Sequence, residues 1–142
     1  MKRFTLILIA TSLFYLAASA QDQKEMVSKC ALSVGENTTY LKDYVIKLPK
    51  AGEKANLPVY KADFLMMKKQ SYRFTMCNAE SSNGELILAL YDKDKLVITS
   101  KVGDKVYNSF DFTCNKTGKY TLWYTFNNGQ QGMGVGIVSL LK

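Results

Sequence analysis

The chain has 142 residues, with 19 Lys and Arg residues against 12 Asp and Glu, three cysteines, one tryptophan and no histidine. Without histidine it lacks the Ser-His-Asp and Cys-His machinery of nucleophilic catalysis and the commonest zinc ligand. Its basic residues are spread along the sequence and form no dense stripe with aromatic stacking partners. The composition therefore argues against a histidine-based enzyme, a zinc protein and a nucleic-acid-binding protein.

The first twenty residues have the features of a secretory signal peptide. Lys2 and Arg3 precede the apolar run FTLILIATSLFYLAA, and Ala18-Ser19-Ala20 supplies the small-x-small pattern that signal peptidase cleaves. Because the run is shorter than the ~20 residues of a membrane span, we predict a periplasmic or secreted protein without a membrane span; the alternative is a retained anchor. Of the 19 basic residues, only Lys2 and Arg3 leave with this segment, so 17 remain against 12 acidic residues. That excess supports at most a mild preference for acidic surfaces or anionic glycans.

The remainder divides into a polar arm and a β-rich domain. Residues 21–37 are polar and mixed, and we predict a short helix or an irregular arm there. From residue 38 onward, segments rich in β-branched and aromatic residues alternate with turn residues, and no helical period appears. About eight strands are expected, in chain order TYLKDYVIKL, VYKADFLMM, YRFTMC, LILALY, LVITS, YNSFDFTC, KYTLWYTF and GVGIVSLL. The pattern predicts one all-β domain over residues 38–142, an antiparallel, jelly-roll-like β-sandwich.

Alternation within the strands predicts which side chains enter the core. One face of the amphipathic strands carries these apolar residues: Tyr44, Ile46, Leu48, Tyr60, Ala62, Phe64, Met66, Tyr72, Phe74, Met76, Tyr120, Leu122, Tyr124 and Phe126. LILALY is apolar on both faces, which is typical of a central strand with both faces covered. Gly132, Gly134 and Gly136 precede a strand and not a helix, so we interpret them as sites of close backbone approach or a bulge and not as a phosphate loop.

The order of several strand sequences is similar to that of known domains. YRFTM, LILALYD, FDFTC, TGKYTLWY and GVGIVSL, over residues 72–141, resemble the jelly-roll plan of bacterial pre-peptidase C-terminal-like and GOLD-like domains. The chain also resembles small secreted proteins of Bacteroidetes-type bacteria. The resemblance implies a module that binds or assists and does not catalyse.

Trp123 is the candidate ligand-binding residue. If the aromatic-rich face of KYTLWYTF is the core face, Trp123 stands on the outer face between Thr121 and Thr125. Sugar-binding sandwiches present such rings because the C–H face of a pyranose stacks on an aromatic face. Trp123, Thr121 and Thr125 are therefore candidate ligand-binding residues. The alternative is that the arm or the 49–58 loop covers Trp123, since a large aromatic residue is usually well buried.

The acidic residues provide two weaker hypotheses. Glycoside hydrolysis needs two carboxyl groups that face each other across a cleft, but Asp92, Asp94, Asp104 and Asp111 lie in predicted turns or on exposed strand faces. Asp92 and Asp94 could begin a calcium loop, but lysines alternate with them and no third acid follows, so a plain β-turn is favoured. We therefore expect no cofactor and no metal, and leave calcium near Asp92 and Asp94 open.

Three cysteines in an oxidising compartment predict one disulfide and one free thiol. Cys77 and Cys114 close strands that three turns separate, so in an up-down order they lie at opposite ends of the sheet, beyond disulfide reach. Cys30 is then a partner of one of them. We predict Cys30–Cys114, because Cys114 shares a face with Phe110 and Phe112, where apolar residues of the arm would dock. Cys77 is then the free thiol, a small buried apolar residue.

Together these features predict an exported, non-enzymatic binding module for a protein or a glycan at the cell envelope or outside the cell. A structural or assembly protein of the envelope is the alternative, and a small carboxylate-based glycoside hydrolase is the third hypothesis. A shallow groove at Trp123 would favour a glycan, a long unpaired apolar edge would favour protein assembly, and a buried acid pair in a cleft would favour the hydrolase.

The signal-peptide pattern predicts where the mature chain begins. Cleavage after Ala20 leaves Gln21 at the N-terminus, because Ala18-Ser19-Ala20 is the well-placed small-x-small pattern. Mass spectrometry of periplasmic or secreted material measures this mass directly. Recovery of the chain from membranes with Met1 in place would contradict the prediction.

Overall fold

The structure is a computed structural model that describes residues 20–53 and 56–142. Apart from Ala20, the predicted signal peptide lies outside the described residues. Within the described ranges, no helix is long and apolar enough to cross a membrane.

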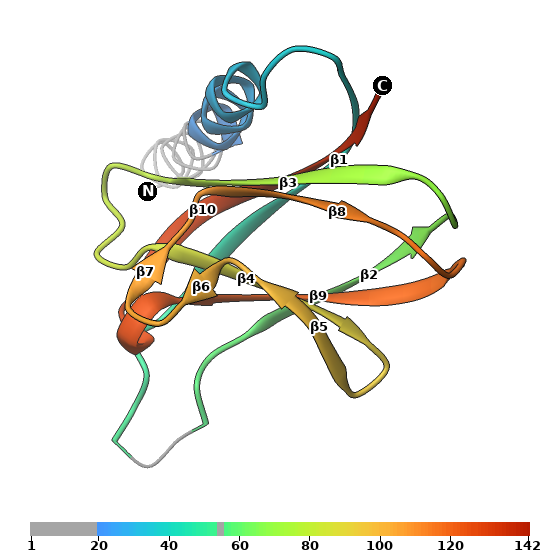
Figure 1. The fold of residues 1–142 in the computed structure, drawn as a ribbon. Helices are drawn as coiled ribbons and strands as arrows, with labels where there is room; N and C mark the ends of the chain where they lie inside the picture. The colour runs from blue at the N-terminus through green and yellow to red at the C-terminus, as the bar shows by residue number, and fades with distance from the viewer. Residues whose placement is uncertain (1–19, 54–55) are drawn as a thin grey trace, which may run out of the picture.

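Eight main strands form two stacked antiparallel sheets (Figure 1). The first sheet has the order β1-β10-β3-β8 and the second has the order β2-β9-β4-β5. Their bounds are β1 Thr38–Leu48, β2 Tyr60–Met66, β3 Ser71–Asn78, β4 Leu86–Asp92, β5 Lys95–Thr99, β8 Ser109–Thr113, β9 Gly118–Phe126 and β10 Gly132–Leu141. Except for the β4–β5 hairpin, each step from one of these strands to the next crosses between the sheets. This is the strand order of a jelly roll, so the predicted antiparallel all-β sandwich is confirmed.

Two short elements complete the fold, and the first of them was not predicted from the sequence. β6 (Lys101–Val102) and β7 (Lys105–Val106) form a small hairpin after β5, with Gly103 in the left-handed region at φ 61°. A 3-10 turn, η1 (Asn127–Gly129), joins β9 to β10. Two-residue strands are too short to show an alternation, so the sequence gives no sign of this hairpin.

The predicted apolar faces meet between the sheets. Ile46, Phe74 and Leu122 are fully buried in this core. β4 is an inner strand of its sheet, and Ile87 on its outer face is only 8% exposed, but Ala89 and Tyr91 on that face are half-buried, so the expectation that both faces are covered holds only in part. A Cβ atom at Gly136 would collide with the phenol ring of Tyr124, so the interpretation of the glycines as close-approach positions is confirmed here.

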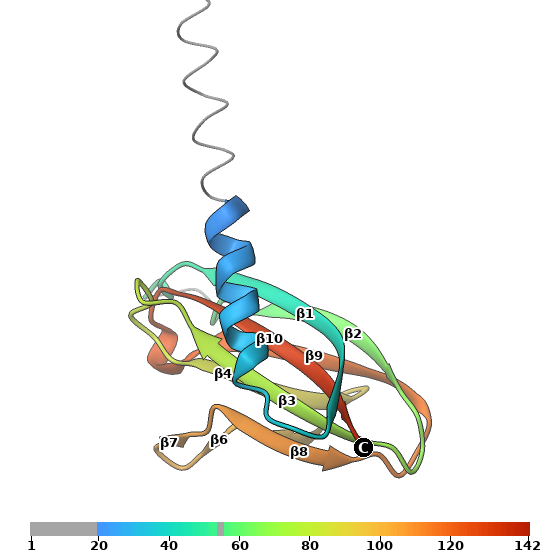
Figure 2. The same ribbon diagram turned by 90° about the horizontal axis from the view of Figure 1, so that it is seen from above.

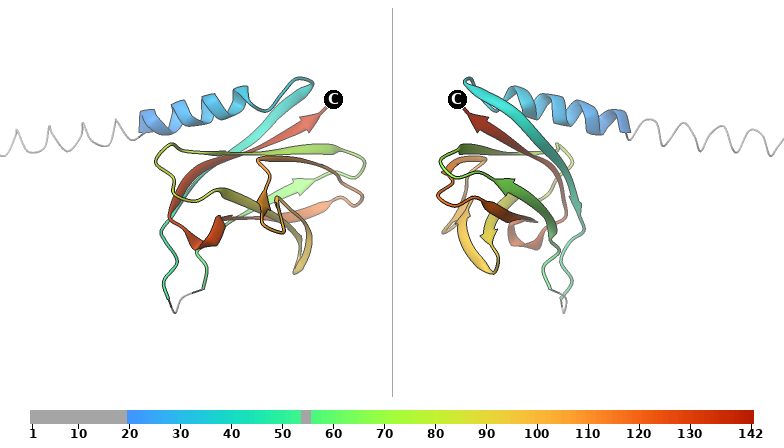
Figure 3. Two further views of the ribbon diagram at one scale, coloured as in Figure 1. Left: turned by 60° about the vertical axis from the view of Figure 1, so that its left-hand side comes forward. Right: turned by 90° about the vertical axis from the view of Figure 1, so that its right-hand side faces the viewer.

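A helix over residues 20–32 lies across the outer face of the first sheet (Figures 2 and 3). The structure therefore shows the helical alternative for the arm. Cys30 and Val34 are buried against Val135 and Ile137 of β10. Partly buried neighbours enlarge this second core: Met26, Val27, Val45 and Cys77.

The disulfide joins Cys30 to Cys77, whose Cα atoms lie 5.8 Å apart. The predicted Cys30–Cys114 bond and the predicted free Cys77 are therefore wrong. The arm packs on the outer face of the first sheet, where Cys77 points, and not against the inner face. Cys114 is the free thiol, and it is buried in the main core, where its Sγ donates to the Lys116 carbonyl oxygen at 3.0 Å.

The conclusion that Cys77 and Cys114 lie too far apart to bond is correct, although the sheets do not have the up-down strand order on which it rested. β3 and β8 pair antiparallel, with Ser71 opposite Thr113, so the two cysteines lie near opposite ends of this strand pair. The error was in the face to which the arm docks. The alternation of YRFTMC places Cys77 on the face opposite Phe74, and that face is the one the helix covers.

Loss of the disulfide should destabilise the fold strongly. Cys30 and Cys77 are 47 residues apart, and closing a loop of that length stabilises by about 4 kcal/mol in the chain-entropy model. Cys30→Ser and Cys77→Ser should each lower the free energy of unfolding by up to about this amount, and the double variant by little more. Urea unfolding with and without a reductant measures the effect. Reductant should destabilise the unmodified chain and Cys114→Ala alike but not the double variant, and a Cys30–Cys114 peptide in non-reducing mapping would contradict the assignment.

Tyr120 and Tyr124, both on β9, form a matched pair of buried phenols. The Tyr120 hydroxyl donates to the Lys116 carbonyl oxygen at 3.0 Å, whereas the Tyr124 hydroxyl has no hydrogen-bond partner among the described residues. Burial raises the pKa of Tyr124, and burial followed by the contact with Cys114 raises the pKa of Tyr120 to about 12. Both phenols are therefore protonated at neutral pH.

Removing the two hydroxyls should have opposite consequences. Tyr124→Phe takes away an unpaired buried polar group and should leave the free energy of unfolding unchanged or raise it by up to ~1 kcal/mol. Tyr120→Phe breaks a hydrogen bond and should lower it by about 1 kcal/mol. Urea unfolding at pH 7 measures both values. A loss above ~1 kcal/mol for Tyr124→Phe would mean that this hydroxyl has a partner.

Candidate functional site

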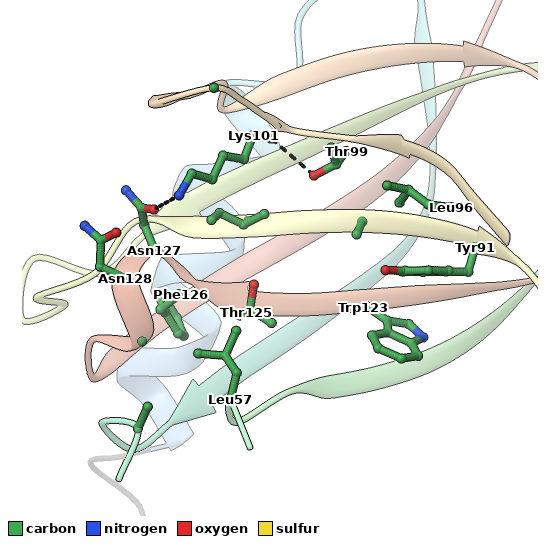
Figure 4. Close-up of a pocket in the computed structure, with 15 residues that line it drawn as sticks. Leu57, Tyr91, Leu96, Thr99, Lys101, Trp123, Thr125, Phe126, Asn127 and Asn128 are labelled. Carbon is green, nitrogen blue, oxygen red and sulfur yellow. Dashed lines mark hydrogen bonds between the residues drawn. The ribbon is translucent and has the colours of Figure 1, made fainter. Parts of the chain in front are cut away.

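The outer face of the second sheet carries a groove of about 720 Å³ (Figure 4). Ala89 on β4 forms part of its floor, paired with Trp123 of β9 on one side and Thr99 of β5 on the other. The floor lies low at Ala89 because its methyl group is much smaller than its neighbours. Ile87 continues the apolar floor along the same strand.

Side chains of a connecting segment define one end of the groove, and side chains of β4 and β5 define the other. Leu57 and Ala51 of the 49–58 loop approach one end beside η1, where the Ala51 amide donates to the Gly129 carbonyl oxygen at 2.8 Å. A Cβ atom at Gly129 would lie 2.8 Å from the Ala51 Cβ, so glycine allows this close contact. Tyr91 of β4 and Leu96 of β5 line the groove near the β4–β5 turn.

Trp123 lies on the outer face, as predicted, and is partly exposed. Its ring packs against that of Tyr91, with centroids 4.5 Å apart and an interplanar angle of 34°. The ammonium group of Lys61, on β2, lies 3.8 Å from the centroid of the indole ring. The arm packs on the other sheet, and the 49–58 loop brings Leu57 to the groove without burying the indole completely. The role of Trp123 in binding stays a prediction.

The structure brings together two of the three predicted ligand-binding residues. Thr125 lines the groove with Trp123, but Thr121 does not. The Thr121 hydroxyl donates to Asp63 Oδ1 at 3.0 Å, and Lys119 pairs with the same carboxylate at 3.1 Å. The hydrogen bonds from Lys119 and then from Thr121 lower the pKa of Asp63. Thr121 therefore belongs to a surface ion-pair cluster outside the groove.

Sequence reasoning missed several residues of the groove. Lys101 is the first residue of β6, and its Nζ donates to Asn127 Oδ1 at 2.8 Å (Figure 4). Tyr91 and Lys61 reach Trp123 from the neighbouring strands. The alternation of LILALYD does indicate that Ala89 and Tyr91 share a face. The cross-strand register that places them beside Trp123 has no signal in a single sequence.

The four acidic residues of the hydrolase hypothesis are not brought together. Asp92 Oδ2 lies 3.9 Å from Lys116 Nζ, and Asp94 lies two residues after Asp92, in the β4–β5 turn. Asp104 is exposed in the β6–β7 turn. Asp111 lies on the other sheet, where Arg73 binds it through two nitrogens at 2.7 and 2.8 Å and the hydrogen bond from Arg73 lowers its pKa. Among the described residues that line the groove, none is a carboxylate.

No family model matches the chain, and no curated protein matches its sequence. The structure is similar to that of PliG from Aeromonas hydrophila, a periplasmic lysozyme inhibitor of g-type lysozyme, with 10% sequence identity and a TM-score of 0.48. The similarity covers 75% of this chain and 88% of that chain. A likeness of this size carries no argument about function. The expected resemblance to pre-peptidase C-terminal-like and GOLD-like domains stays a prediction.

Proposed function

We propose that the chain is an exported, non-enzymatic module that binds a glycan along the Trp123 groove. The observation that carries the proposal is a partly exposed indole, paired with a phenol ring, beside a low apolar floor. A binding site for a small ligand combines this kind of apolar lining with a few polar groups that fix orientation. Thr99, Thr125 and Asn128 supply such groups in the groove.

The arrangement fits the two chemical faces of a sugar ring. The C–H groups of a pyranose carry partial positive charge, and they pack on the electron-rich face of an aromatic ring. Its hydroxyl groups both donate and accept hydrogen bonds, which hydroxyl and amide side chains satisfy. In this proposal the rings of Trp123 and Tyr91 provide the apolar contact, and Asn128 and Thr125 bind the hydroxyl groups.

The chemistry of the groove supports binding without hydrolysis. A glycosidase of the usual kind needs two carboxyl groups about 5–10 Å apart around the scissile bond. The described lining of the groove has no carboxylate, and the whole chain has no histidine. The groove itself therefore offers no general acid or base of these types.

The disulfide supports the exported part of the proposal. Disulfides persist in the periplasm and outside the cell, whereas the cytosol keeps thiols reduced. Cys30 follows the predicted signal peptide by ten residues and is bonded to Cys77 in the second core. A periplasmic or secreted location is therefore proposed.

A protein partner is the second candidate, because β5 is an edge strand that borders the groove. Leu96 and Val97 on this strand are 47% and 37% exposed. An extended segment of another protein could add to such an edge through main-chain hydrogen bonds, as in β-strand addition. An assembly role at the cell envelope would use the same edge.

Two variants that change the groove in opposite ways test the glycan proposal. Trp123→Ala removes the stacking surface, and Ala89→Leu fills the floor with a larger outward-facing side chain. Both should reduce glycan binding at least about tenfold, the equivalent of roughly 1.4 kcal/mol. A glycan array followed by titration calorimetry with the best binder measures this.

Leu65→Ala is the matched control, because Leu65 is an exposed apolar residue of β2 outside the groove. Its glycan binding and urea midpoint should match those of the unmodified chain closely, and both groove variants should still unfold in a single cooperative transition. Unchanged binding in both groove variants would place the glycan elsewhere. An array with no binder at all would reject the glycan proposal and favour the protein partner at β5.

A further inference from the structure

The described lining of the groove carries positive charge and no negative charge. Lys101 is the charged residue among the described groove residues, and its ammonium group bonds the neutral amide oxygen of Asn127. Lys61 lies at the border of the groove, over the indole of Trp123. All twelve acidic residues of the chain lie in the described ranges, and none of them forms an ion pair with Lys101 or Lys61.

Two lysines outside the groove, Lys119 on β9 and Lys116 in the β8–β9 connection, do form ion pairs. Lys119 pairs with Asp63 at 3.1 Å, and Lys116 lies 3.9 Å from Asp92. These two carboxylates are thus engaged by lysines outside the groove. The exposed Asp104 in the β6–β7 turn is close to Lys101 in sequence, yet it forms no ion pair with it.

The two ammonium groups lie at different points along β9 and the turn that follows it. That of Lys61 lies 3.8 Å from the centroid of the Trp123 indole, and that of Lys101 donates to Asn127 Oδ1. Four residues of extended chain separate Trp123 from Asn127, so their backbones are about 13 Å apart. A ligand that reaches both ammonium groups must extend over more than one sugar ring.

We infer that the glycan is an acidic oligosaccharide, with carboxylate or sulfate groups that bind Lys101 and Lys61. This inference rests on the proposed function. An anionic group of the ligand would add a charge-assisted hydrogen bond to Lys101, which now has only a neutral acceptor. A second anionic group would draw Lys61 away from the indole, because an exposed cation–π contact is weak. The face of Trp123 that Lys61 now covers then becomes available to the C–H face of a sugar.

An acidic peptide would satisfy the two lysines but not the rest of the groove. The Trp123–Tyr91 pair and the hydroxyl and amide groups of Thr99, Thr125 and Asn128 match a ring with one apolar face and a polar edge. The observations therefore favour a saccharide over a peptide of the same charge, and the peptide becomes an outcome of the test.

The test compares ligands that differ in charge or in backbone. The probes are an oligogalacturonate, the same oligomer after reduction of its carboxyl groups, a sulfated dextran oligomer and an oligoglutamate. Binding is followed by titration calorimetry and by the fluorescence of Trp123, the one tryptophan of the chain. We expect at least one acidic saccharide to bind about tenfold or more tightly than the reduced oligomer, with an affinity that falls as salt increases. Emission from Trp123 should change as Lys61 leaves the ring.

Lys101→Gln and Lys61→Gln should each bring the ratio of the affinities for the acidic saccharide and for the reduced oligomer close to one. Lys42→Gln is the charge-matched control, because Lys42 is an exposed residue of β1 on the other sheet, and it should keep the preference.

The outcomes separate the two proposals. Equal binding of acidic and reduced oligomers, lost in Trp123→Ala, would overturn the acidic preference and leave the glycan function intact. Equal binding of oligoglutamate and the acidic saccharides would overturn the saccharide in favour of an acidic protein segment. No binding to any of the three saccharides, when the array has shown other glycan binders, would overturn the acidic class alone. An array without binders would overturn both proposals.

Discussion

The alternation of side chains along β9 is the constraint on which the site depends. Leu122 and Tyr124 are fully buried between the sheets, and the strand geometry then forces Trp123 to the opposite face. A shift of one residue in register would exchange the two faces. It would bury the indole and expose Leu122 and Tyr124 to solvent. The main core therefore holds Trp123 outward even though a large aromatic residue is usually better buried.

The two outer faces of the sandwich differ in how much of each is covered by other segments. On the first sheet, the helix and its disulfide cover Val135 and Ile137 and close a second core. On the second sheet, the cover is incomplete: Ala51, Leu57, η1 and the β6–β7 hairpin border the face but leave the groove between them (Figure 4). The open face is therefore where a ligand can reach the sheet, and the closed face adds stability.

Much of the fold follows from the sequence, because a period of two is a local signal. The alternation of apolar and polar residues correctly predicted the main strands and the inward direction of Tyr44, Phe74 and Tyr120. It also predicted the outward position of Trp123. The Cys30 pairing was wrong because the face on which an arm docks depends on tertiary packing, although the alternation already put Cys77 outward. Lys61, Lys101 and Asn127 were missed for a related reason. Each of these residues reaches the groove through the pairing register of neighbouring strands or through a turn. The alternation of residues within one strand encodes neither the register nor the turn.

Both ends of the described chain lie on the side of the sandwich opposite the groove. The helix lies on the first sheet, and the amide of Lys142 donates to the Asn37 carbonyl oxygen at 2.9 Å, so both ends of the described chain leave from the side opposite the groove (Figure 1). A support that holds the molecule by either end, whether a resin, a sensor chip or a fused domain, would present the groove to the solution. Attachment at either end would therefore leave the thickness of the sandwich between the support and the groove.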